Sequence, residues 1–399
     1  MSMSFAESQV SASERDRGKP AIDDPLSILL LARSLETGGA ERQLVELARG
    51  LRTRGHSVTV AAFYKRGPLV AELESASIPL IDLRKRGRWD VIGFFWRARK
   101  LLRKMRPDVL YSFLGGANVI AALVARAVPK TRLVWSVRSA DVDLSKYDWL
   151  HTTIYLVERA ISGAPDLIIA NSNKGMDYAI AQGFPAFKFA IVPNGIDVAR
   201  FSADPQIRSV QRASWGVADE QIAIGTLARL DPMKDHVTFL HAAALAARQR
   251  SDLRFLCIGD GAEEARLKSL VVELDITDRV TFTGQADASA ALNALDIACS
   301  SSITEGFPNA IAEAMACGLP CVVTDVGDSA FIVGDNGVVV PRSDPKALAA
   351  ALLDQASRLV SHDAARARAR IVGNFSVDAM IDRTAGLLQN LSRHNGRRN

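Results

Sequence analysis

The chain has 399 residues, of which 48% are hydrophobic and 23% charged, and it carries a formal net charge of +5. This composition is typical of a soluble globular protein, and no run of about 18 apolar residues is present that would span a membrane. Because a domain takes roughly 100–200 residues, the length predicts two domains.

The first 24 residues are expected to form a disordered polar tail. They are rich in Ser and charged residues, and such a segment cannot bury enough apolar surface to fold. They also lack the apolar segment of a secretory signal. The four cysteines stand in apolar contexts without the partners of a zinc site, and we expect reduced core residues of a cytoplasmic protein: Cys257, Cys299, Cys317 and Cys321.

From Leu26 on, short apolar segments alternate with segments of helical periodicity. The first half predicts buried strands at 26–35, 57–64, 108–114, 132–138, 166–172 and 189–195, with helices at 40–55, 67–76 and 117–128. Strands that are apolar on both faces and separated by helices indicate a parallel sheet covered on both sides.

The same alternation restarts after a pause near residues 195–206, which are rich in Gly, Asp and Pro. The second half predicts strands at 221–229, 254–261, 279–284, 296–301, 320–325 and 337–341. The chain is therefore predicted to be an α/β protein of two Rossmann-like, doubly wound domains that face each other across a cleft. Ligands of such sheets bind beyond the carboxyl ends of the strands, so functional residues should follow strands directly.

Two glutamates bracket the start of a helix in the stretch "SSITEGFPNAIAEAMACGLP". Glu305 lies in the loop after a predicted strand, Pro308 suits the first helical position, and Glu313 lies about one and a half turns further on. Free N–H groups at a helix start attract phosphate, whereas carboxylates accept hydrogen bonds from sugar hydroxyls. The pattern predicts a ligand with a ribose, a pyrophosphate and a hexose. The alternative is a helix with an ordinary surface Glu.

Two further motifs follow strands. Arg229 and Lys234 stand at the carboxyl edge of the strand predicted at 221–229, where two cations can neutralise a pyrophosphate leaving group without a metal. Gly38 and Gly39 form the turn after the first strand and let a ligand approach the backbone. This turn is not G-x-G-x-x-G, so a dinucleotide cofactor is not supported. A surface charge pair and a simple tight turn are the alternatives.

Together these motifs resemble those of the retaining glycosyltransferases of family 4, which have the GT-B fold. The resemblance covers Leu26 to about Leu391, and the Glu-x7-Glu element is its most specific part. It implies an N-terminal, acceptor-binding domain at 25–200 and a C-terminal, nucleotide-sugar-binding domain at 201–375. Residues 376–399 would form a helix that returns to the N-terminal domain, and a basic tail.

The resemblance also implies roles for residues. Glu313 would hold the ribose, Glu305 would lie near the donor sugar, and Arg229 with Lys234 would grip the diphosphate. Gly38 and Gly39 would approach the donor from the N-terminal domain. The backbone of the loop between the glutamates would reach the sugar hydroxyls or the diphosphate: Gly306, Phe307, Pro308 and Asn309. No cofactor or metal would be required, and a UDP sugar is favoured over a GDP sugar.

One departure concerns the acceptor side. Many family members carry a His after the strand that matches 132–138, and this chain offers Arg138, Ser139 and Asp141 instead. At the matching position, the resemblance implies that Arg138 is a polar group facing the acceptor. The alternative is an ordinary Arg at a strand end. Asp141 and Asp143 form the Asp-x-Asp pattern that holds a metal in another glycosyltransferase class, and we interpret them as a coincidental loop pair.

The charge is divided unevenly between the two halves. Residues 1–200 contain 29 Lys and Arg against 20 Asp and Glu, a net charge of +9, whereas the remainder contains 20 against 24, a net charge of −4. A basic half suggests that one face meets an anionic surface or substrate. Chance and the demands of solubility are the alternative explanation.

The basic stretch 84–106 predicts contact with an anionic membrane. In a helix from Asp90, Ile92 and Trp96 fall off the predicted core face and lie beside Arg99 and Arg103, as at a lipid headgroup region. The alternative is a core helix with a solvated basic face, and no nucleic-acid motif is present. The expected core face collects seven apolar residues: Val91, Phe94, Phe95, Ala98, Leu101, Leu102 and Met105.

The sequence thus predicts a metal-independent, retaining transfer of a hexose or N-acetylhexosamine from a nucleotide-diphosphate sugar to a hydroxyl acceptor. The expected acceptor is a lipid-linked or polysaccharide-precursor glycan, and the expected location is the cytoplasm, with peripheral attachment to the inner face of the cell membrane. Two alternatives stay open: a nucleotide-sugar epimerase or hydrolase of GT-B fold, and a non-catalytic sugar-nucleotide-binding subunit.

Overall fold

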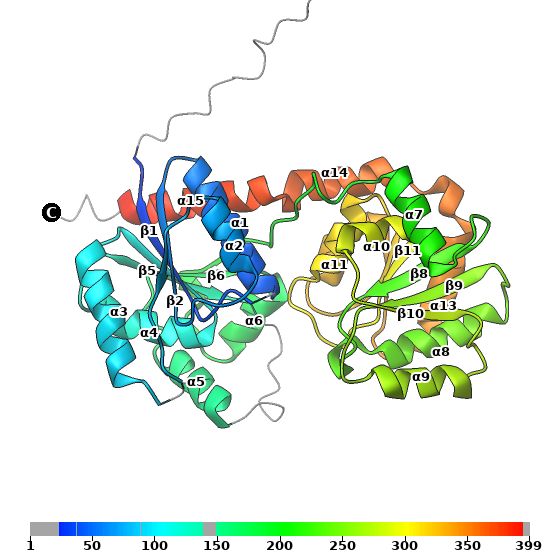
Figure 1. Ribbon diagram of the computed structural model, residues 1–399, viewed down its shortest axis with the longest axis horizontal. Coiled ribbons are helices and arrows are strands. Elements are labelled where there is room, and N and C mark those ends of the chain that lie inside the picture. Colours follow the sequence, from blue (N-terminus) through cyan, green and yellow to red (C-terminus); the bar gives the residue numbers. More distant parts are fainter. Residues whose placement is uncertain (1–23, 37, 88, 139–148, 394–399) are drawn as a thin grey trace, which may run out of the picture.

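The computed structural model describes residues 24–36, 38–87, 89–138 and 149–393. The chain forms two lobes side by side, and each lobe is a parallel β-sheet between layers of helices (Figure 1). The prediction of an α/β protein with two Rossmann-like domains is confirmed. None of the helices in the described ranges is long and apolar enough to cross a membrane.

The first lobe contains a seven-stranded sheet in the order β3-β2-β1-β4-β5-β6-β7. Every neighbouring pair of strands is parallel. The strands are β1 (Ser27–Ala32), β2 (Ser57–Ala62), β3 (Leu80–Asp82), β4 (Val109–Phe113), β5 (Arg132–Val137), β6 (Leu167–Ala170) and β7 (Phe189–Ile191).

Helices cover both faces of this sheet because its strands are apolar on both faces. In β1, Ile28 and Leu30 pack against α1 and α2, whereas Leu29 and Leu31 pack against α3 and α4. The helices of the lobe are α1 (Gly39–Thr53), α2 (Leu69–Ser75), α3 (Ile92–Met105), α4 (Gly115–Ala125), α5 (Trp149–Ala160) and α6 (Asn173–Ala181), with a 3-10 turn at Ala186–Lys188.

The second lobe repeats the design with a six-stranded parallel sheet in the order β10-β9-β8-β11-β12-β13. Its strands are β8 (Ile222–Leu227), β9 (Leu253–Ile258), β10 (Val280–Gly284), β11 (Ile297–Ser300), β12 (Cys321–Thr324) and β13 (Gly337–Val340). The four cysteines are free and buried in this lobe, which confirms the predicted core role.

Helices again form two layers, one with α10, α11 and α14 and the other with α8, α9 and α13. The helices are α7 (Pro205–Trp215), α8 (His236–Ala247), α9 (Glu264–Glu273), α10 (Ala288–Ala294), α11 (Asn309–Ala316), α12 (Ser329–Val333), α13 (Pro345–Ser357) and α14 (Ala364–Phe375), with 3-10 turns at Pro232–Lys234, Gly334–Asn336 and Leu359–Ser361.

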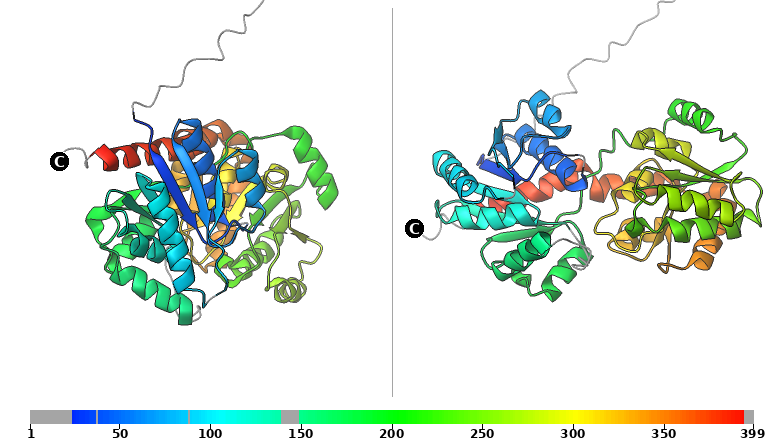
Figure 2. Two further views of the ribbon diagram at one scale, coloured as in Figure 1. Left: turned by 60° about the vertical axis from the view of Figure 1, so that its left-hand side comes forward. Right: turned by 60° about the horizontal axis from the view of Figure 1, so that its bottom comes forward.

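The chain passes between the lobes twice, and the two crossings lie side by side. Ile196 N–H donates to the Phe375 carbonyl at 2.7 Å, and Val377 N–H donates to the Ile196 carbonyl at 3.0 Å. The last helix, α15 (Val377–Arg393), then packs on α1 of the first lobe (Figures 1 and 2). A Cβ on Gly50 of α1 would lie 1.8 Å from Ile381, so the glycine permits this close packing.

Two local predictions were wrong. Val91 was expected on the core face of the basic helix, but α3 begins at Ile92 and Val91 is exposed, because it precedes the helix and leaves its buried stripe. Pro308 was expected at the first helical position, but it is the N-cap of α11, which begins at Asn309. The exact limits predicted for the domains stay predictions.

Candidate active site

Lys234 and Glu305 lie together at the carboxyl edge of the second sheet. They follow β8 and β11, which are neighbours in that sheet, and Lys234 Nζ lies 2.6 Å from Glu305 Oε1. Ser302 Oγ donates to the same carboxylate oxygen at 2.7 Å. Ser301 Oγ also donates to the Lys234 carbonyl at 3.0 Å. The two loops are therefore fixed to each other, with a cation and a carboxylate side by side.

Glu313 stands one helical turn into α11, beyond the loop that carries Glu305. Burial raises the pKa of Glu313 to about 7, although the charges of Arg200 and Arg42 act in the opposite direction. In the described part of the chain the Glu313 carboxyl accepts no hydrogen bond, so its oxygens are available for donor groups of a ligand. A carboxyl with this pKa is divided between its neutral and ionised forms near neutral pH.

Arg229 is not brought together with Lys234 and Glu305. Its side chain is 73% exposed and pairs with Asp231 at 2.8 Å. The proposed grip of Arg229 on a diphosphate therefore stays a prediction. It would require the guanidinium to leave Asp231, whose side chain is only 19% exposed.

The loop from Gly306 to Asn309 presents backbone rather than large side chains. The Phe307 ring is buried and packs on Phe375, with ring centroids 5.7 Å apart. Pro308 is also buried. Of these four residues, Asn309 reaches the first lobe: its Oδ1 accepts from Asn194 Nδ2 at 2.8 Å.

Glycines let the two lobes approach each other here. A Cβ on Gly39 would lie 3.4 Å from Asn309 Nδ2, and a Cβ on Gly306 would lie 3.4 Å from the Arg138 carbonyl. Gly39 is the first residue of α1, and Gly38 is its N-cap. The predicted glycine turn of the first lobe and the predicted loop of the second lobe therefore meet.

Arg138 follows β5 and faces this junction. Its guanidinium donates to Ser136 Oγ at 2.8 Å and to Asn194 Oδ1 at 2.7 Å, and it stacks over the Phe113 ring at 4.9 Å. Burial lowers the pKa of Arg138 from its ordinary value. The side chain is thus held in place at the end of the first sheet, beside the loop of the second lobe.

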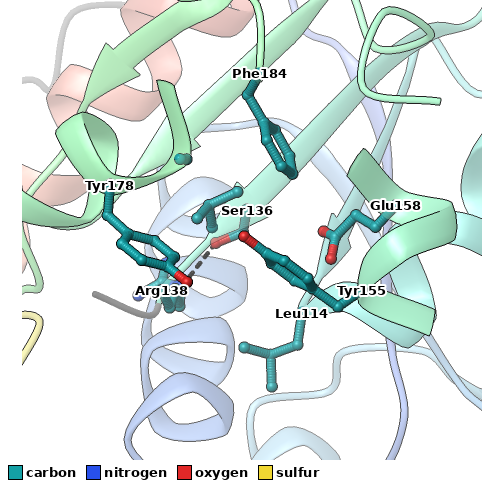
Figure 3. Close-up of a pocket in the computed structure, with 10 residues that line it drawn as sticks. Leu114, Ser136, Arg138, Tyr155, Glu158, Tyr178 and Phe184 are labelled. Carbon is teal, nitrogen blue, oxygen red and sulfur yellow. Dashed lines mark hydrogen bonds between the residues drawn. The ribbon is translucent and has the colours of Figure 1, made fainter. Parts of the chain in front are cut away.

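Arg138 also lines a small cavity of about 50 Å³ inside the first lobe (Figure 3). Glu158 of α5 borders it and accepts from Asn118 Nδ2 at 2.6 Å; burial raises the pKa of Glu158 to about 6. The Tyr155 hydroxyl is buried next to Tyr178, and burial raises the pKa of Tyr155. The cavity has room for one or a few water-sized groups, and its lining includes the polar side chains of Ser136, Tyr155, Glu158 and Tyr178.

The sequence did not single out Asn171, Asn194 or Asp328 as site residues. Asn171 follows β6, and its buried Oδ1 lacks a partner among the described residues, 3.7 Å from where a Cβ on Gly306 would lie. Asn194 follows β7 and links Arg138 with Asn309. All three follow strands, so the rule that placed Glu305 could also have found them.

The Asp141–Asp143 pair lies outside the described residues. Within the ranges that the structure describes, no group of three or more His, Cys, Asp or Glu side chains is arranged to hold a metal ion.

Two family models match the chain. The model described as Glycosyltransferase Family 4 matches residues 37–200, and the model described as Glycosyl transferases group 1 matches residues 221–358. Each model thus falls on one of the two lobes.

Known proteins with similar sequences cover most of the chain. EpsF of Bacillus subtilis (strain 168), provisionally named a glycosyltransferase, is 31% identical over 317 residues, which are 75% of this chain and 79% of that protein. The UDP-Gal:alpha-D-GlcNAc-diphosphoundecaprenol alpha-1,3-galactosyltransferase of Escherichia coli is 22% identical over 299 residues, 72% of this chain and 76% of that protein.

A solved structure shares the architecture. HepE of Anabaena, crystallised in complex with UDP, matches with a TM-score of 0.80 and 24% identity over 92% of this chain and 100% of that chain. This likeness confirms the GT-B arrangement of the two domains.

Proposed function

The chain belongs to glycosyltransferase family 4, and from this premise we propose that it moves a hexose or N-acetylhexosamine from a nucleotide-diphosphate sugar to a lipid-linked or polysaccharide-precursor glycan. The proposed reaction keeps the anomeric configuration and needs no metal. A UDP sugar is the favoured donor, in line with the UDP-galactose in the name of the similar E. coli galactosyltransferase.

The observation that carries this proposal is the Lys234–Glu305 pair at 2.6 Å, with Glu313 further along on α11. Lys234 supplies positive charge where a diphosphate would develop negative charge as a leaving group. The start of α11 offers free N–H groups to the same phosphates. Glu313 would accept hydrogen bonds from the ribose hydroxyls, and Glu305 from a hydroxyl of the donor sugar.

The proposed chemistry is a front-face displacement. The acceptor oxygen bonds to the anomeric carbon as the bond from that carbon to the diphosphate oxygen breaks, and the acceptor's proton passes to a phosphate oxygen. Glu305 Oε1 is engaged by Lys234 and Ser302, which suits a carboxylate that orients the sugar better than a nucleophile. Lys234 would stabilise the departing diphosphate.

The acceptor would approach from the first lobe. Arg138 stands beside the loop of the second lobe and lines the cavity with Tyr155 and Glu158 (Figure 3). These groups suit the hydroxyls of a glycan, because a tyrosine hydroxyl both donates and accepts and a carboxyl accepts. The role of Arg138 toward the acceptor is part of this proposal.

A lipid-linked acceptor would be met at a membrane, and α3 offers a surface for it. Ile92 and Trp96 are 76% and 58% exposed, and the Arg99 guanidinium lies over the Trp96 ring at 5.8 Å. Apolar side chains among cations fit the headgroup region of an anionic bilayer. We therefore propose that stretch 84–106 attaches the protein to the inner face of the cell membrane.

The test is an assay with UDP-galactose, UDP-glucose and UDP-N-acetylglucosamine, with and without an N-acetylglucosaminyl diphospholipid extract. UDP release that requires the extract, with sugar recovered on lipid, is the expected result. Equal donor turnover without the extract would instead favour the epimerase or hydrolase. Donor binding without any turnover would favour a non-catalytic subunit.

A further inference from the structure

Asp328 belongs to the second lobe, but its carboxylate binds the first lobe. It follows β12 and occupies the N-cap position of α12 without capping that helix. Its oxygens instead accept from Asn173 N–H at 2.8 Å, Lys174 N–H at 3.0 Å and Asn173 Nδ2 at 2.9 Å. Asp328 is only 2% exposed. A buried carboxylate thus caps α6 of the opposite lobe.

Asp328 caps α6 because the first N–H groups of that helix require hydrogen-bond acceptors. The first N–H groups of a helix have no partner inside the helix. The side chain of Ser172, the N-cap, accepts from Gly175 N–H at 3.1 Å, and the N–H groups of Asn173 and Lys174 are bound by Asp328. Hydrogen bonds to an ionised carboxylate are stronger than neutral ones, and the positive end of the helix dipole adds to the attraction.

The backbone around Asp328 is tied to the donor loop of its own lobe. Asp328 N–H donates to the Gly306 carbonyl at 3.0 Å. Gly327 has a φ of +52°, and a Cβ there would lie 2.3 Å from the Glu305 carbonyl. Only glycine tolerates both this conformation and this contact. The segment that carries Asp328 therefore packs directly on Glu305 and Gly306.

We propose that Asp328 is a positioning residue for transfer: it fixes the loop of Glu305 and Gly306 against the first lobe. Its N–H holds the loop while its carboxylate holds α6, so a single residue connects the donor side with the acceptor side. The inference rests on the proposed function, because it assigns the two lobes to donor and acceptor.

Loss of the Asp328 carboxylate should loosen the contact between the lobes without weakening nucleotide binding. The groups proposed to hold the nucleotide, Lys234 and Glu313, both lie in the second lobe, so nucleotide affinity should be largely kept. Transfer needs both lobes in register, because a small misplacement of reactants costs much of the rate. Asp328 should therefore affect kcat far more than the donor Kd.

The chain offers a matched control in Asp344. This residue caps α13 by accepting from Lys346 N–H and Ala347 N–H, both at 3.0 Å, within the second lobe. Asp344→Ala therefore removes a helix cap of the same chemistry without touching the junction. Its expected effect is a small drop in melting temperature, with the junction between the lobes unchanged.

The experiment compares Asp328→Ala, Asp328→Asn and Asp344→Ala in a chain labelled at Lys130→Cys and Thr277→Cys. These two positions are exposed, one in each lobe, and the native cysteines are buried. Double electron–electron resonance gives the distance between the labels, UDP calorimetry gives the donor Kd, and the lipid assay gives kcat. Asp328→Asn serves as a nearly isosteric variant if Asp328→Ala does not fold.

We expect longer and broader label distances in the Asp328 variants. The kcat should fall about tenfold or more, and the UDP Kd should stay within about twofold. Asp344→Ala should match the parent in distance and kcat. Parent-like distances in Asp328→Asn, or an equal loss in Asp344→Ala, would overturn the inference. The distance measurement needs no turnover, so a failure of the proposed function is distinguished from a failure of the junction.

Discussion

Lys234 Nζ lies 2.6 Å from Glu305 Oε1, although the two residues are 71 positions apart in the sequence. They meet because β8 and β11 are adjacent parallel strands whose carboxyl ends share one edge of the sheet. Ser302 Oγ donates to the same carboxylate oxygen, so the fold itself holds the carboxylate beside the cation. Preorganised charge of this kind is the most effective form of electrostatic stabilisation.

The pair gives a first prediction. Lys234→Ala should lower kcat/KM by roughly 1.5–3 kcal/mol, about 10- to 150-fold, because it removes a cation from the leaving group and leaves Glu305 unpaired. Lys268→Ala is the control, since it breaks an exposed Lys–Glu pair at 2.7 Å outside the site. Arg229→Ala should cost less than Lys234→Ala. Equal kinetics in Lys234→Ala and Lys268→Ala would remove Lys234 from the mechanism.

Glu313 predicts a pH dependence of stability. Its pKa in the folded protein is about 7, above the ordinary 4.5, so the folded state retains this proton more strongly than the unfolded state. The stability that this group contributes is fully present below about pH 4.5 and is lost as the pH rises through 7. The free energy of unfolding in urea, plotted against pH from 5 to 8, should therefore have different slopes for wild type and Glu313→Gln. Identical slopes would contradict the shifted pKa.

The same carboxyl predicts how donor binding depends on pH. Ribose hydroxyls bind best to the ionised form, so UDP-glucose affinity should rise as the pH increases through about 7, with proton release on binding. Glu313→Gln should weaken binding by roughly 1.5–3 kcal/mol and abolish the pH step. Calorimetry in two buffers of different ionisation enthalpy measures both the affinity and the number of protons released on binding. Glu264→Gln, on an exposed helix face, is the control, and unchanged affinity in Glu313→Gln would separate this residue from the ribose.

Removal of the Tyr155 hydroxyl should weaken binding of the acceptor alone. Because the hydroxyl is buried next to Tyr178, Tyr155→Phe should cost at most about 1 kcal/mol of folding stability. The same change should raise the KM for the N-acetylglucosaminyl diphospholipid about fivefold. This factor corresponds to the loss of one hydrogen bond of about 1 kcal/mol. Tyr64→Phe, at a tyrosine stacked with Arg66, is the control. A lower melting temperature with an unchanged KM would show that the hydroxyl serves the fold.

The exposed side chains of α3 predict reversible membrane binding. Co-sedimentation with anionic vesicles should exceed that with neutral vesicles and should weaken at high salt, because each cation contributes on the order of 1 kcal/mol. Trp96→Ala combined with Arg99→Glu and Arg103→Glu should abolish it. Val272→Ala with Arg266→Glu and Lys268→Glu makes the same change on α9 of the other lobe. Equal, negligible pelleting on both lipids would contradict membrane attachment and favour a soluble acceptor.

The architecture and the positions of Lys234 and Glu305 directly after strands could be predicted because they depend on local sequence, but the ion pair between the two side chains was not predicted. Apolar runs specify buried strands, and the carboxyl ends of parallel strands gather at one edge, so residues directly after strands meet. The spacing of Glu305 and Glu313 around a helix start is a local feature of the same kind.

The contacts between lobes could not be predicted in this way. The bond from Asn194 to Asn309 and the cap of Asp328 on α6 depend on how two folded lobes dock, which no periodicity records. The exposure of Arg229 was missed for a related reason: its position after a strand was read correctly, but its pairing with Asp231 depends on a turn whose geometry the sequence leaves open.

The most direct test of the account is the anomeric configuration of the product, measured by NMR after transfer from a UDP-α-hexose in excess EDTA. We expect transfer that survives chelation and yields an α-linked product on the lipid acceptor. A β-linked product would contradict retention at this site. Abolition of transfer by EDTA, with rescue by Mn²⁺, would contradict the role given to Lys234 and would return the Asp141–Asp143 pair to consideration.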